Sequence, residues 1–219
     1  KSSLLRSLSG SDAFVEDRLF ATVDAATRMV DLGEGYEALV TDTVGFIRKL
    51  PHHLVASFRA TLEETLNADL LLHVIDISHP MWEEQKDVVD DVLEDLGLAE
   101  RPQVLVFNKV DRLTHEEEEI WKQRASTLFT RPTIFVTSME AGGTEPLREL
   151  LRERVREQNR EVDILLPVTA GGMLAEIYRE GEVLDREDEG TGITLRARIP
   201  EALLGRLKQQ PGVEIQDGA

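Results

Sequence analysis

Short runs of apolar residues alternate along the chain with longer stretches in which apolar positions recur every three to four residues. The short runs are typical of buried strands, and the periodic stretches are typical of helices that cover a sheet. The pattern predicts strands near 37–42, 70–76, 103–108 and 133–137, and helices near 54–67, 81–96, 115–129 and 144–158. A further helical pattern begins at the first residues and stops at Gly10. This alternation favours an α/β fold with a doubly wound, mostly parallel sheet.

A second, smaller unit is expected after the polar stretch 152–160. The pattern there predicts a strand near 162–167, a helix near 172–179, a strand near 182–184, a turn at 190–192, a strand near 193–199 and a helix opened by Pro200. We therefore expect a first domain of residues 1–159 and a small α+β carboxyl-terminal domain of residues 160–219.

Charge and composition narrow the function classes. The chain has 25 lysine and arginine residues against 42 aspartate and glutamate residues, a formal net charge of −17, which opposes binding to nucleic acid, so we expect no DNA partner. The absence of cysteine excludes disulfides and fits a reducing compartment. No apolar run approaches the roughly 18 residues of a membrane helix, so we expect no stable membrane anchor and place the protein in the cytoplasm. The histidines lack metal-ligand spacing, and His73 is expected to be a satisfied core residue.

The motif Asp42-Thr43-Val44-Gly45-Phe46 directly follows the apolar run 36–40. Asp42 then lies at the carboxyl end of a strand, where open α/β sheets bind their ligands, and a carboxylate there can hold Mg²⁺. Gly45 has no Cβ, which lets its backbone N–H approach a terminal phosphate closely. We interpret the motif as a nucleotide switch. For the motif alone, an ordinary strand-end turn is the alternative.

The chain begins with Lys1-Ser2-Ser3, which matches the end of the phosphate-binding loop G-x-x-x-x-G-K-[ST] that opens a helix. On this interpretation Lys1 reaches the β- and γ-phosphates, the Ser2 hydroxyl binds Mg²⁺, and Ser3 lies near the α-phosphate. The loop glycines and the strand that carries them are expected upstream of Lys1. The sequence is therefore expected to be a piece of a longer protein.

The motif Asn108-Lys109-Val110-Asp111 follows the apolar run 104–107. Asp111 can accept two hydrogen bonds from the N1–H and the exocyclic amine of guanine, which adenine does not present in that arrangement. Asn108 can bond the purine edge, and the Lys109 stem can lie against the ring face. After the strand near 133–137, we choose the backbone N–H of Ser138 for the contact with guanine O6.

These segments in order resemble a TRAFAC-class GTPase, and longer stretches narrow the resemblance to the HflX family. The stretches are 17–24 (DRLFATVD), 42–51 (DTVGFIRKLP), 58–64 (FRATLEE) and 68–76 (ADLLLHVID). The resemblance covers almost the whole chain. It implies a P-loop GTPase domain followed by a small carboxyl-terminal domain, with GTP as substrate, GDP as product and Mg²⁺ as cofactor.

The resemblance also implies site residues and partners. Thr22 would be the switch threonine that closes on Mg²⁺ and the γ-phosphate, with Thr27 as the alternative. The partner would be the ribosome, mainly the rRNA and proteins of the large subunit, in the separation of stalled or stressed particles, and we expect a monomer. Because the net charge repels rRNA, the contact would need a basic surface upstream of Lys1, a local cluster of Arg48, Lys49 and Arg59, or ribosomal proteins.

Phe46 stands where many GTPases keep a glutamine that positions the attacking water, and its ring cannot hydrogen-bond water. We hypothesise that Thr22, the backbone of Gly45 and a partner acting in trans complete the catalytic site, so that hydrolysis is slow without the partner. The alternative is a nucleotide-gated ribosome-binding module in which hydrolysis is not required for the main activity. A relative that acts on membranes or in RNA modification is a third hypothesis, for which the sequence shows no anchor and no modification site.

Overall fold

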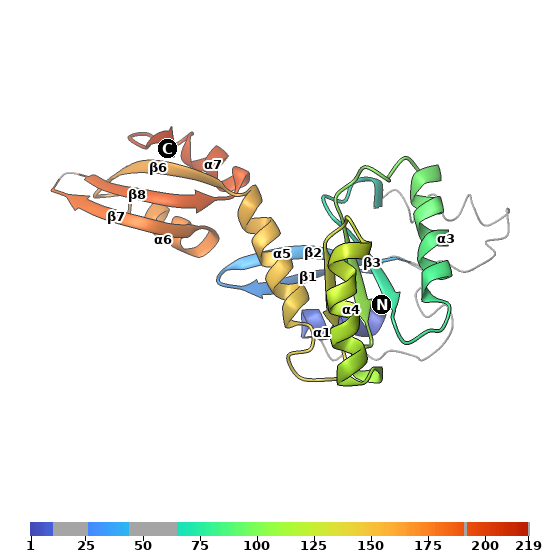
Figure 1. The fold of residues 1–219 in the computed structure, drawn as a ribbon. Helices are drawn as coiled ribbons and strands as arrows, with labels where there is room; N and C mark the ends of the chain where they lie inside the picture. Colours follow the sequence, from blue (N-terminus) through green and yellow to red (C-terminus); the bar gives the residue numbers. More distant parts are fainter. Residues whose placement is uncertain (11–25, 44–64, 191, 219) are drawn as a thin grey trace. The chain divides into compact units, whose positions relative to one another are not determined.

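The computed structural model describes residues 1–10, 26–43, 65–190 and 192–218 (Figure 1). The chain separates into two compact units, one of Lys1–Val30 with Leu39–Arg148 and one of Asp31–Ala38 with Glu149–Ala219. The domain boundary expected after residue 159 stays a prediction, because a division by contacts does not test which segment folds alone. No helix in the described ranges is long and apolar enough to cross a membrane.

The elements up to residue 158 largely follow the predicted pattern. They are α1 (Ser2–Ser9), β1 (Ala26–Gly33), β2 (Tyr36–Asp42), β3 (Leu71–Asp76), α3 (Trp82–Asp95), β4 (Gln103–Asn108), the 3-10 turn η2 (Val110–Arg112), α4 (His115–Leu128), β5 (Thr133–Val136) and α5 (Glu145–Gln158). Strand β1 was not predicted, and most of the helix expected near 54–67 lies outside the described residues. Helix α1 ends at Gly10 as predicted, where a left-handed backbone with φ of 63° favours glycine.

Strands β3, β4 and β5 form a parallel sheet in that order, which agrees with the predicted fold class. Every residue of the central strand β4 is buried, as expected for a parallel strand covered on both faces. Residue Asp76 is the register partner of Asn108, and Asn108 is the partner of Val136. The loops that follow the three strands therefore leave the sheet side by side.

An aromatic cluster packs between this sheet and helices α3 and α4. Trp82 of α3 lies edge-on to Phe107 of β4 and to Trp121 of α4, with ring centroids 5.3 Å apart in both pairs. Phe107 stacks on Phe135 of β5 at 5.1 Å. Such pairs contribute about 0.5–1.5 kcal/mol each beyond the burial of their area. The cluster thus fixes β4 and β5 next to the polar residues at their ends.

Helix α1 is held beside the beginning of α5. The guanidinium Nη2 of Arg148 donates to the carbonyl oxygen of Leu8 at 2.9 Å, and the hydroxyl oxygens of Ser7 and Thr144 are 3.4 Å apart. Leu4, Leu5 and Leu8 are buried at the predicted helical spacing.

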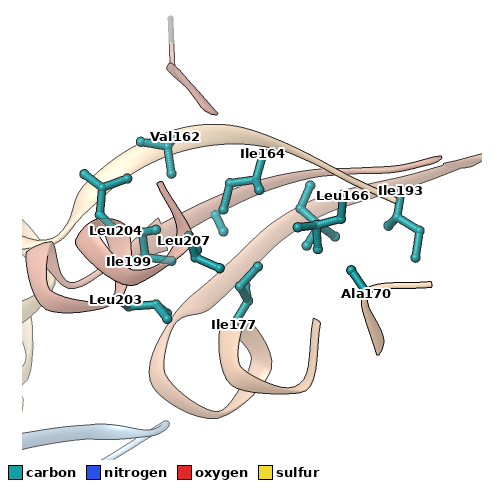
Figure 2. Packing of buried hydrophobic residues seen from close by; sticks show 12 residues of the cluster. Val162, Ile164, Leu166, Ala170, Ile177, Ile193, Ile199, Leu203, Leu204 and Leu207 are labelled. Atoms are coloured by element: carbon teal, nitrogen blue, oxygen red, sulfur yellow. The ribbon is translucent and has the colours of Figure 1, made fainter. Parts of the chain in front are cut away.

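The second unit contains β6 (Arg160–Pro167), α6 (Gly171–Glu180), β7 (Glu182–Glu189), β8 (Gly192–Ile199), α7 (Glu201–Leu207) and β9 (Glu214–Asp217). The antiparallel sheet has the order β7-β8-β6-β9, so the chain follows the split βαβ, ferredoxin-like arrangement. Alternate residues of β6 and β8 point into one core with Ile177 of α6 and with Leu203, Leu204 and Leu207 of α7 (Figure 2). Both helices therefore cover the same face of the sheet.

Two strands of this unit depart from the sequence prediction. Strand β7 was expected to end near residue 184, but it continues to Glu189 through exposed charged residues that pair with β8. Strand β9 was not predicted, because Ile215 is its one apolar residue, yet it pairs with β6. In both cases main-chain pairing with a neighbouring strand outweighs a polar local sequence.

Candidate nucleotide-binding site

The amino-terminal end of α1 lies beside the end of β2. The hydroxyl of Ser2, the first residue of the helix, donates to Oδ2 of Asp42 at 2.6 Å. Asp42 is the last residue of β2 and is 8% exposed. Residues 40 positions apart in the sequence thus bring a hydroxyl and a carboxylate together, and their role as metal ligands stays a prediction.

Lys1 precedes the helix at its N-cap position, and its side chain makes no capping hydrogen bond to the helix. Although Lys1 as a residue is exposed, desolvation of its ammonium lowers the pKa of the side chain, and the nearby carboxylate of Asp42 acts in the opposite direction. Asp42 is therefore close enough to act on the Lys1 charge. The positive end of the α1 dipole and the Lys1 ammonium together favour an anion here.

The oxygen atoms of Ser2 and Asp42 fit Mg²⁺, which prefers oxygen ligands and is usually held by one or two carboxylates together with substrate phosphates and water. In the part of the chain that the structure describes, no group of three or more histidine, aspartate or glutamate side chains forms a closed metal cage. The Ser2–Asp42 pair therefore matches an ion whose remaining ligands a phosphate would supply.

Asn108 ends β4 and is 5% exposed. Its backbone carbonyl accepts a hydrogen bond from the N–H of Ile77 at 3.2 Å, which ties the loop after β3 to the end of β4. Its side-chain oxygen Oδ1 is buried and has no hydrogen-bond partner among the described residues. A buried amide oxygen without a partner costs free energy, so this atom is a candidate acceptor for a ligand or for a neighbouring loop.

Lys109 follows with a left-handed backbone, φ 69° and ψ 37°, which is uncommon for a residue other than glycine. Its ammonium Nζ donates to Oδ2 of Asp76, the last residue of β3, at 2.5 Å. The Oδ1 atom of the same carboxylate accepts from the hydroxyl of Ser78 at 2.6 Å. The pKa of Asp76 would rise by burial, but the hydrogen bonds from Lys109 and Ser78 outweigh this and lower it.

Asp111 lies in the turn η2 and is held by the loop after β5. The hydroxyl of Thr137 donates to Oδ1 of Asp111 at 2.5 Å and accepts from the backbone N–H of Met139 at 3.1 Å. Asp111 and Thr137 both line a hollow of about 600 Å³. Asp111 itself is exposed, so the carboxylate is fixed on one side and open to solvent.

Gly143 closes this loop against Thr137. The Thr137 N–H donates to the carbonyl of Gly143 at 3.0 Å. A Cβ at position 143 would lie 2.5 Å from Cγ2 and 2.6 Å from the carbonyl oxygen of Thr137, closer than Cβ atoms normally approach other atoms. Glycine at 143 therefore permits the loop conformation that presents Thr137 to Asp111.

The other predicted site residues are less constrained. Ser3 is exposed on the first turn of α1, and Ser138 is half-buried in the loop after β5. Thr27, the alternative to Thr22, lies in β1 with its hydroxyl 2.9 Å from that of Thr41. Thr22 and Gly45 lie outside the described residues, so their roles stay predictions.

Sequence reasoning assigned no role to Asp76 or Thr137. Asp76 carried a usable signal, because it ends an apolar strand in the same way as Asp42. Thr137 carried a weaker one, a hydroxyl at the end of the strand that precedes the loop containing Ser138.

Fold and site together define the class of protein. The chain carries a P-loop GTPase domain with a parallel sheet, and residues 1–109 match the profile of the family described as 50S ribosome-binding GTPase. The fold is similar to that of a GTP-binding protein from Sulfolobus solfataricus in complex with GDP, with TM-score 0.52 and 23% identity, over 69% of this chain and 47% of that one. A structure of SsGBP with GDP has TM-score 0.55 and 22% identity over 70% of this chain and 45% of that chain.

Curated relatives give the family. GTPase HflX of Magnetococcus marinus is 41% identical over 99% of this chain and 50% of its own length. GTPase HflX of Caldanaerobacter subterraneus is 38% identical over 95% of this chain and 46% of its own length, and GTPase HflX of Escherichia coli is 34% identical over 97% and 50%. The chain belongs to the HflX family of GTPases. It spans about half the length of the curated relatives that it matches.

Proposed function

We propose that the full-length protein binds GTP with Mg²⁺, hydrolyses it to GDP and phosphate, and acts on ribosomes through the large subunit. The observation that carries this proposal is that three motif segments lie in one compact unit. The Ser2–Asp42 pair lies at the start of α1, and the Lys109–Asp76 and Asp111–Thr137 pairs lie at the ends of parallel strands. Open α/β sheets bind ligands at such strand ends. Membership of the HflX family supports the same conclusion.

Each phosphate-side residue has a distinct part in this proposal. Lys1 pairs with the β- and γ-phosphates, and Ser3 lies near the α-phosphate. Ser2 and Asp42 hold Mg²⁺, which when bound neutralises charge on the β- and γ-phosphates. Thr22 completes the metal ligands when the switch closes. The short distance between Ser2 and Asp42 supports these parts, because both oxygen atoms can reach one ion.

The base-side residues discriminate guanine. Asp111 accepts hydrogen bonds from N1–H and the exocyclic amine, Asn108 bonds the purine edge, and the Lys109 stem lies against the ring. The backbone N–H of Ser138 donates to O6. A site built to pair a ligand's polar groups rejects an analogue without them by roughly 10⁴ or more, because its own polar groups are left unpaired.

Hydrolysis needs a water in line with the γ-phosphate. The water oxygen bonds to the γ-phosphorus, the bond to the bridging β-oxygen breaks, and GDP and phosphate leave. Phe46 cannot orient that water, so in this proposal Thr22, the backbone N–H of Gly45 and a ribosomal group complete the site. A partner in trans supplies large rate increases in related chemistry, about 10³- to 10⁵-fold for an arginine finger. Hydrolysis then acts as a timer coupled to release from the ribosome.

The ribosomal partner is inferred from the family that residues 1–109 match, which is described as 50S ribosome-binding GTPase. The net charge of −17 opposes direct contact by this part of the chain with rRNA. Basic surface elsewhere in the full-length protein, or contacts to ribosomal proteins, would resolve that conflict. Action as a monomer in the cytoplasm belongs to the same proposal.

The test is GTP turnover by the full-length protein with and without purified large ribosomal subunits. We expect large subunits to raise turnover by roughly tenfold or more, and small subunits to have little effect. Lys1→Met removes the ammonium at the phosphate site and is expected to abolish turnover. Lys208→Met, at the exposed end of α7 in the second unit, is the matched control and is expected to behave as wild type. Equal turnover with and without large subunits would show that hydrolysis is not coupled to them.

The nucleotide-gated binding module remains the second candidate, because Phe46 replaces a catalytic glutamine. The two candidates differ in whether hydrolysis is needed to separate subunits. A Phe46 variant that binds GTP, does not hydrolyse it and still separates ribosomal subunits at wild-type speed would favour the binding module. Failure of that variant to complete more than one round would favour the timer.

A further inference from the structure

The ammonium of Lys109 is held by the strand that neighbours its own. Asp76 ends β3 and Lys109 follows β4, and their side chains meet at 2.5 Å. Ser78 donates to the other carboxylate oxygen from its hydroxyl at 2.6 Å and from its backbone N–H at 3.2 Å. Both bonds from Ser78 fix the orientation of the carboxylate that holds the lysine. The lowered pKa of Asp76 keeps this carboxylate ionised at neutral pH.

The backbone of Lys109 gives this contact a second function. A left-handed conformation is unfavourable at a residue other than glycine, so surrounding contacts must hold it. From that backbone the side chain extends to β3, with its two ends fixed by the turn before Asp111 and by Asp76. A lysine fixed at both ends presents its methylene stem as an apolar strip, whereas a free lysine samples many rotamers.

We propose that Asp76 is a positioning residue for the purine base: it holds the Lys109 ammonium so that the methylene stem forms a preorganised apolar surface against the face of the ring. The inference rests on the proposed guanine-nucleotide site and adds a residue to which no part in that site has been assigned. Asp76 acts through Lys109 and does not touch the base.

This role predicts a specific pattern of binding. The ring faces of purines are alike, so loss of the preorganised stem weakens guanine, hypoxanthine and xanthine nucleotides by the same factor. Discrimination between bases belongs to Asp111 and is left unchanged. The Asp76–Lys109 pair is also partly exposed, with side-chain exposures of 31% and 40%, so its contribution to folding is small.

The experiment measures dissociation constants of the full-length protein for GDP and inosine diphosphate by displacement of a fluorescent GDP, together with thermal melting. Asp76→Asn keeps the shape and removes the charge. We expect both diphosphates to bind about tenfold more weakly, the loss of one charge-assisted hydrogen bond, with the GDP-to-IDP ratio within twofold of wild type. In GTP turnover KM rises and kcat at saturating GTP stays within twofold. Asp76→Glu, which keeps the charge, is expected to recover part of the affinity.

Asp90 supplies the matched control. Its carboxylate, on α3, is exposed to a similar degree, 27%, and pairs with Lys86 of the same helix and with Arg131 before β5. No motif of the site includes these residues. Asp90→Asn is expected to lower the melting temperature because it loses the two-pronged bond to Arg131, and to leave GDP affinity unchanged. The two substitutions therefore separate a fold effect from a site effect.

A double-mutant cycle tests whether Asp76 acts through Lys109. Lys109→Met keeps a long apolar side chain without the ammonium, and in that background Asp76→Asn is expected to change GDP affinity by less than twofold. An undiminished effect there would overturn the inference, as would wild-type GDP affinity in the single Asp76→Asn variant. If the wild-type protein bound no guanine nucleotide, the proposed function would fail as well. If it bound GDP normally and only the Asp76 effects were absent, this inference alone would be wrong.

Discussion

The carboxylate of Asp111 has one oxygen bonded to the Thr137 hydroxyl and its other side open to solvent. This arrangement fixes the group while leaving acceptor sites for the two donors of guanine. Asp111→Asn places an amide there, which offers donors in place of an acceptor. We expect the guanine-over-xanthine preference to fall by roughly 10²- to 10⁴-fold, since each hydrogen bond to a charged group contributes roughly 1.5–3 kcal/mol. Competition of GDP and xanthosine diphosphate against fluorescent GDP measures it.

The control for Asp111→Asn is Asp87→Asn on α3, where an exposed carboxylate pairs with Lys86. It removes the same charge from a surface with no motif residue and should leave both affinities unchanged. An unaltered base preference in Asp111→Asn would mean that Asp111 does not read the base.

Gly143 lies in the loop after β5 and affects the same contact between Thr137 and Asp111. A methyl group at this position would press on the side chain and carbonyl of Thr137, and the carbonyl belongs to backbone that cannot easily move. We expect Gly143→Ala to cost about 1–3 kcal/mol of stability, as overpacking typically does, and to weaken GDP binding by displacing Thr137 from Asp111. Chemical denaturation and GDP titration measure the two effects.

Gly205→Ala is the comparison for that prediction. Gly205 lies inside helix α7, and a Cβ there meets nothing within 4 Å. The substitution should stabilise the protein by up to about 1 kcal/mol, because alanine favours a helix over glycine. If both glycine variants were equally stable, the close approach at Gly143 would carry no energetic weight.

Single residues also mark the limit of sequence reasoning. Asp42, Asn108 and Asp111 could be named because they follow apolar runs in recognisable motifs. Asp76 and Thr137 are hydrogen-bonded to the motif residues Lys109 and Asp111, which lie 33 and 26 positions away in the chain. A pattern along one segment contains no information on which distant side chain will lie opposite it, so these pairs needed the structure.

At the scale of elements, the turn of the β1–β2 hairpin belongs to the second unit. That unit also contains most of α5 and the small antiparallel sheet. Tyr36, 5% exposed, donates its hydroxyl to Oε2 of Glu182 at 2.9 Å. The guanidinium of Arg156 donates to both oxygens of the same carboxylate, and Arg152 donates to the carbonyl of Leu32 at 3.1 Å. Glu182 therefore joins the hairpin, α5 and β7.

We expect Tyr36→Phe to lower the free energy of unfolding by about 0.5–1.5 kcal/mol, the usual net value of one hydrogen bond. Glu182 keeps Arg156, so the substitution leaves no buried charge unpaired. Burial and the bond to Glu182 also raise the pKa of Tyr36 to about 12, so the hydroxyl stays protonated and the bond persists across ordinary assay pH. Urea denaturation measures the change.

Tyr178→Phe is the control for the hairpin bond. Tyr178 is half exposed on α6 and its hydroxyl bonds to Arg186 at the surface, where solvent competes for the bond, so its substitution should change stability by less than about 0.5 kcal/mol. If the two phenylalanine variants unfolded at the same urea concentration as the wild type, the bond from Tyr36 to Glu182 would not contribute to the stability of this unit.

The elements that the sequence predicted are those with strong apolar periodicity. Strand β4 and helices α3, α4 and α5 begin and end within two residues of expectation. Strand β1 was missed although Val30 and Leu32 are buried at alternate positions, because the charged Arg28 occupies the preceding position on that side of the strand and the apolar Met29 is exposed on the other. Strand β9 has even less local signal, and its pairing with β6 is a tertiary effect that local propensity does not encode.

For the whole molecule, an extended resemblance predicted more than any single pattern. The match to the HflX family extends over nearly the whole chain, so it correctly predicted the family and the parallel sheet of the GTPase domain. It did not give the grouping of residues 31–38 with residues 149–219. The boundary between the two units falls within helix α5 and within both strands of the hairpin. No irregular linker marks it, so the sequence pattern does not reveal it.

One buried side chain of the first unit, His73, is expected to link the stability of that unit to pH. His73 in β3 is buried as expected but not satisfied, because its Nδ1 has no hydrogen-bond partner among the described residues and lies 3.4 Å from Asp90 Oδ1. Burial lowers the pKa of His73 to about 4; Asp90 opposes this shift, while Arg131, Lys86 and Lys1 add to it. The unfolded chain has an ordinary histidine pKa of about 6.5 and so binds a proton first as pH falls.

This proton linkage fixes the sign and the pH window of the last prediction. The contribution of neutral His73 is complete above about pH 6.5 and is lost as pH falls toward 4, because protons then favour the unfolded chain. We expect wild-type stability to fall, relative to His73→Gln, by about 2–3 kcal/mol between pH 7 and pH 4.5. Asp90, whose pKa burial would raise but Arg131 and Lys86 bring to about 2, titrates below this window. Urea unfolding of both proteins at pH 7, 5.5 and 4.5 measures the difference, and parallel stability curves would show that His73 does not stay neutral in the folded protein.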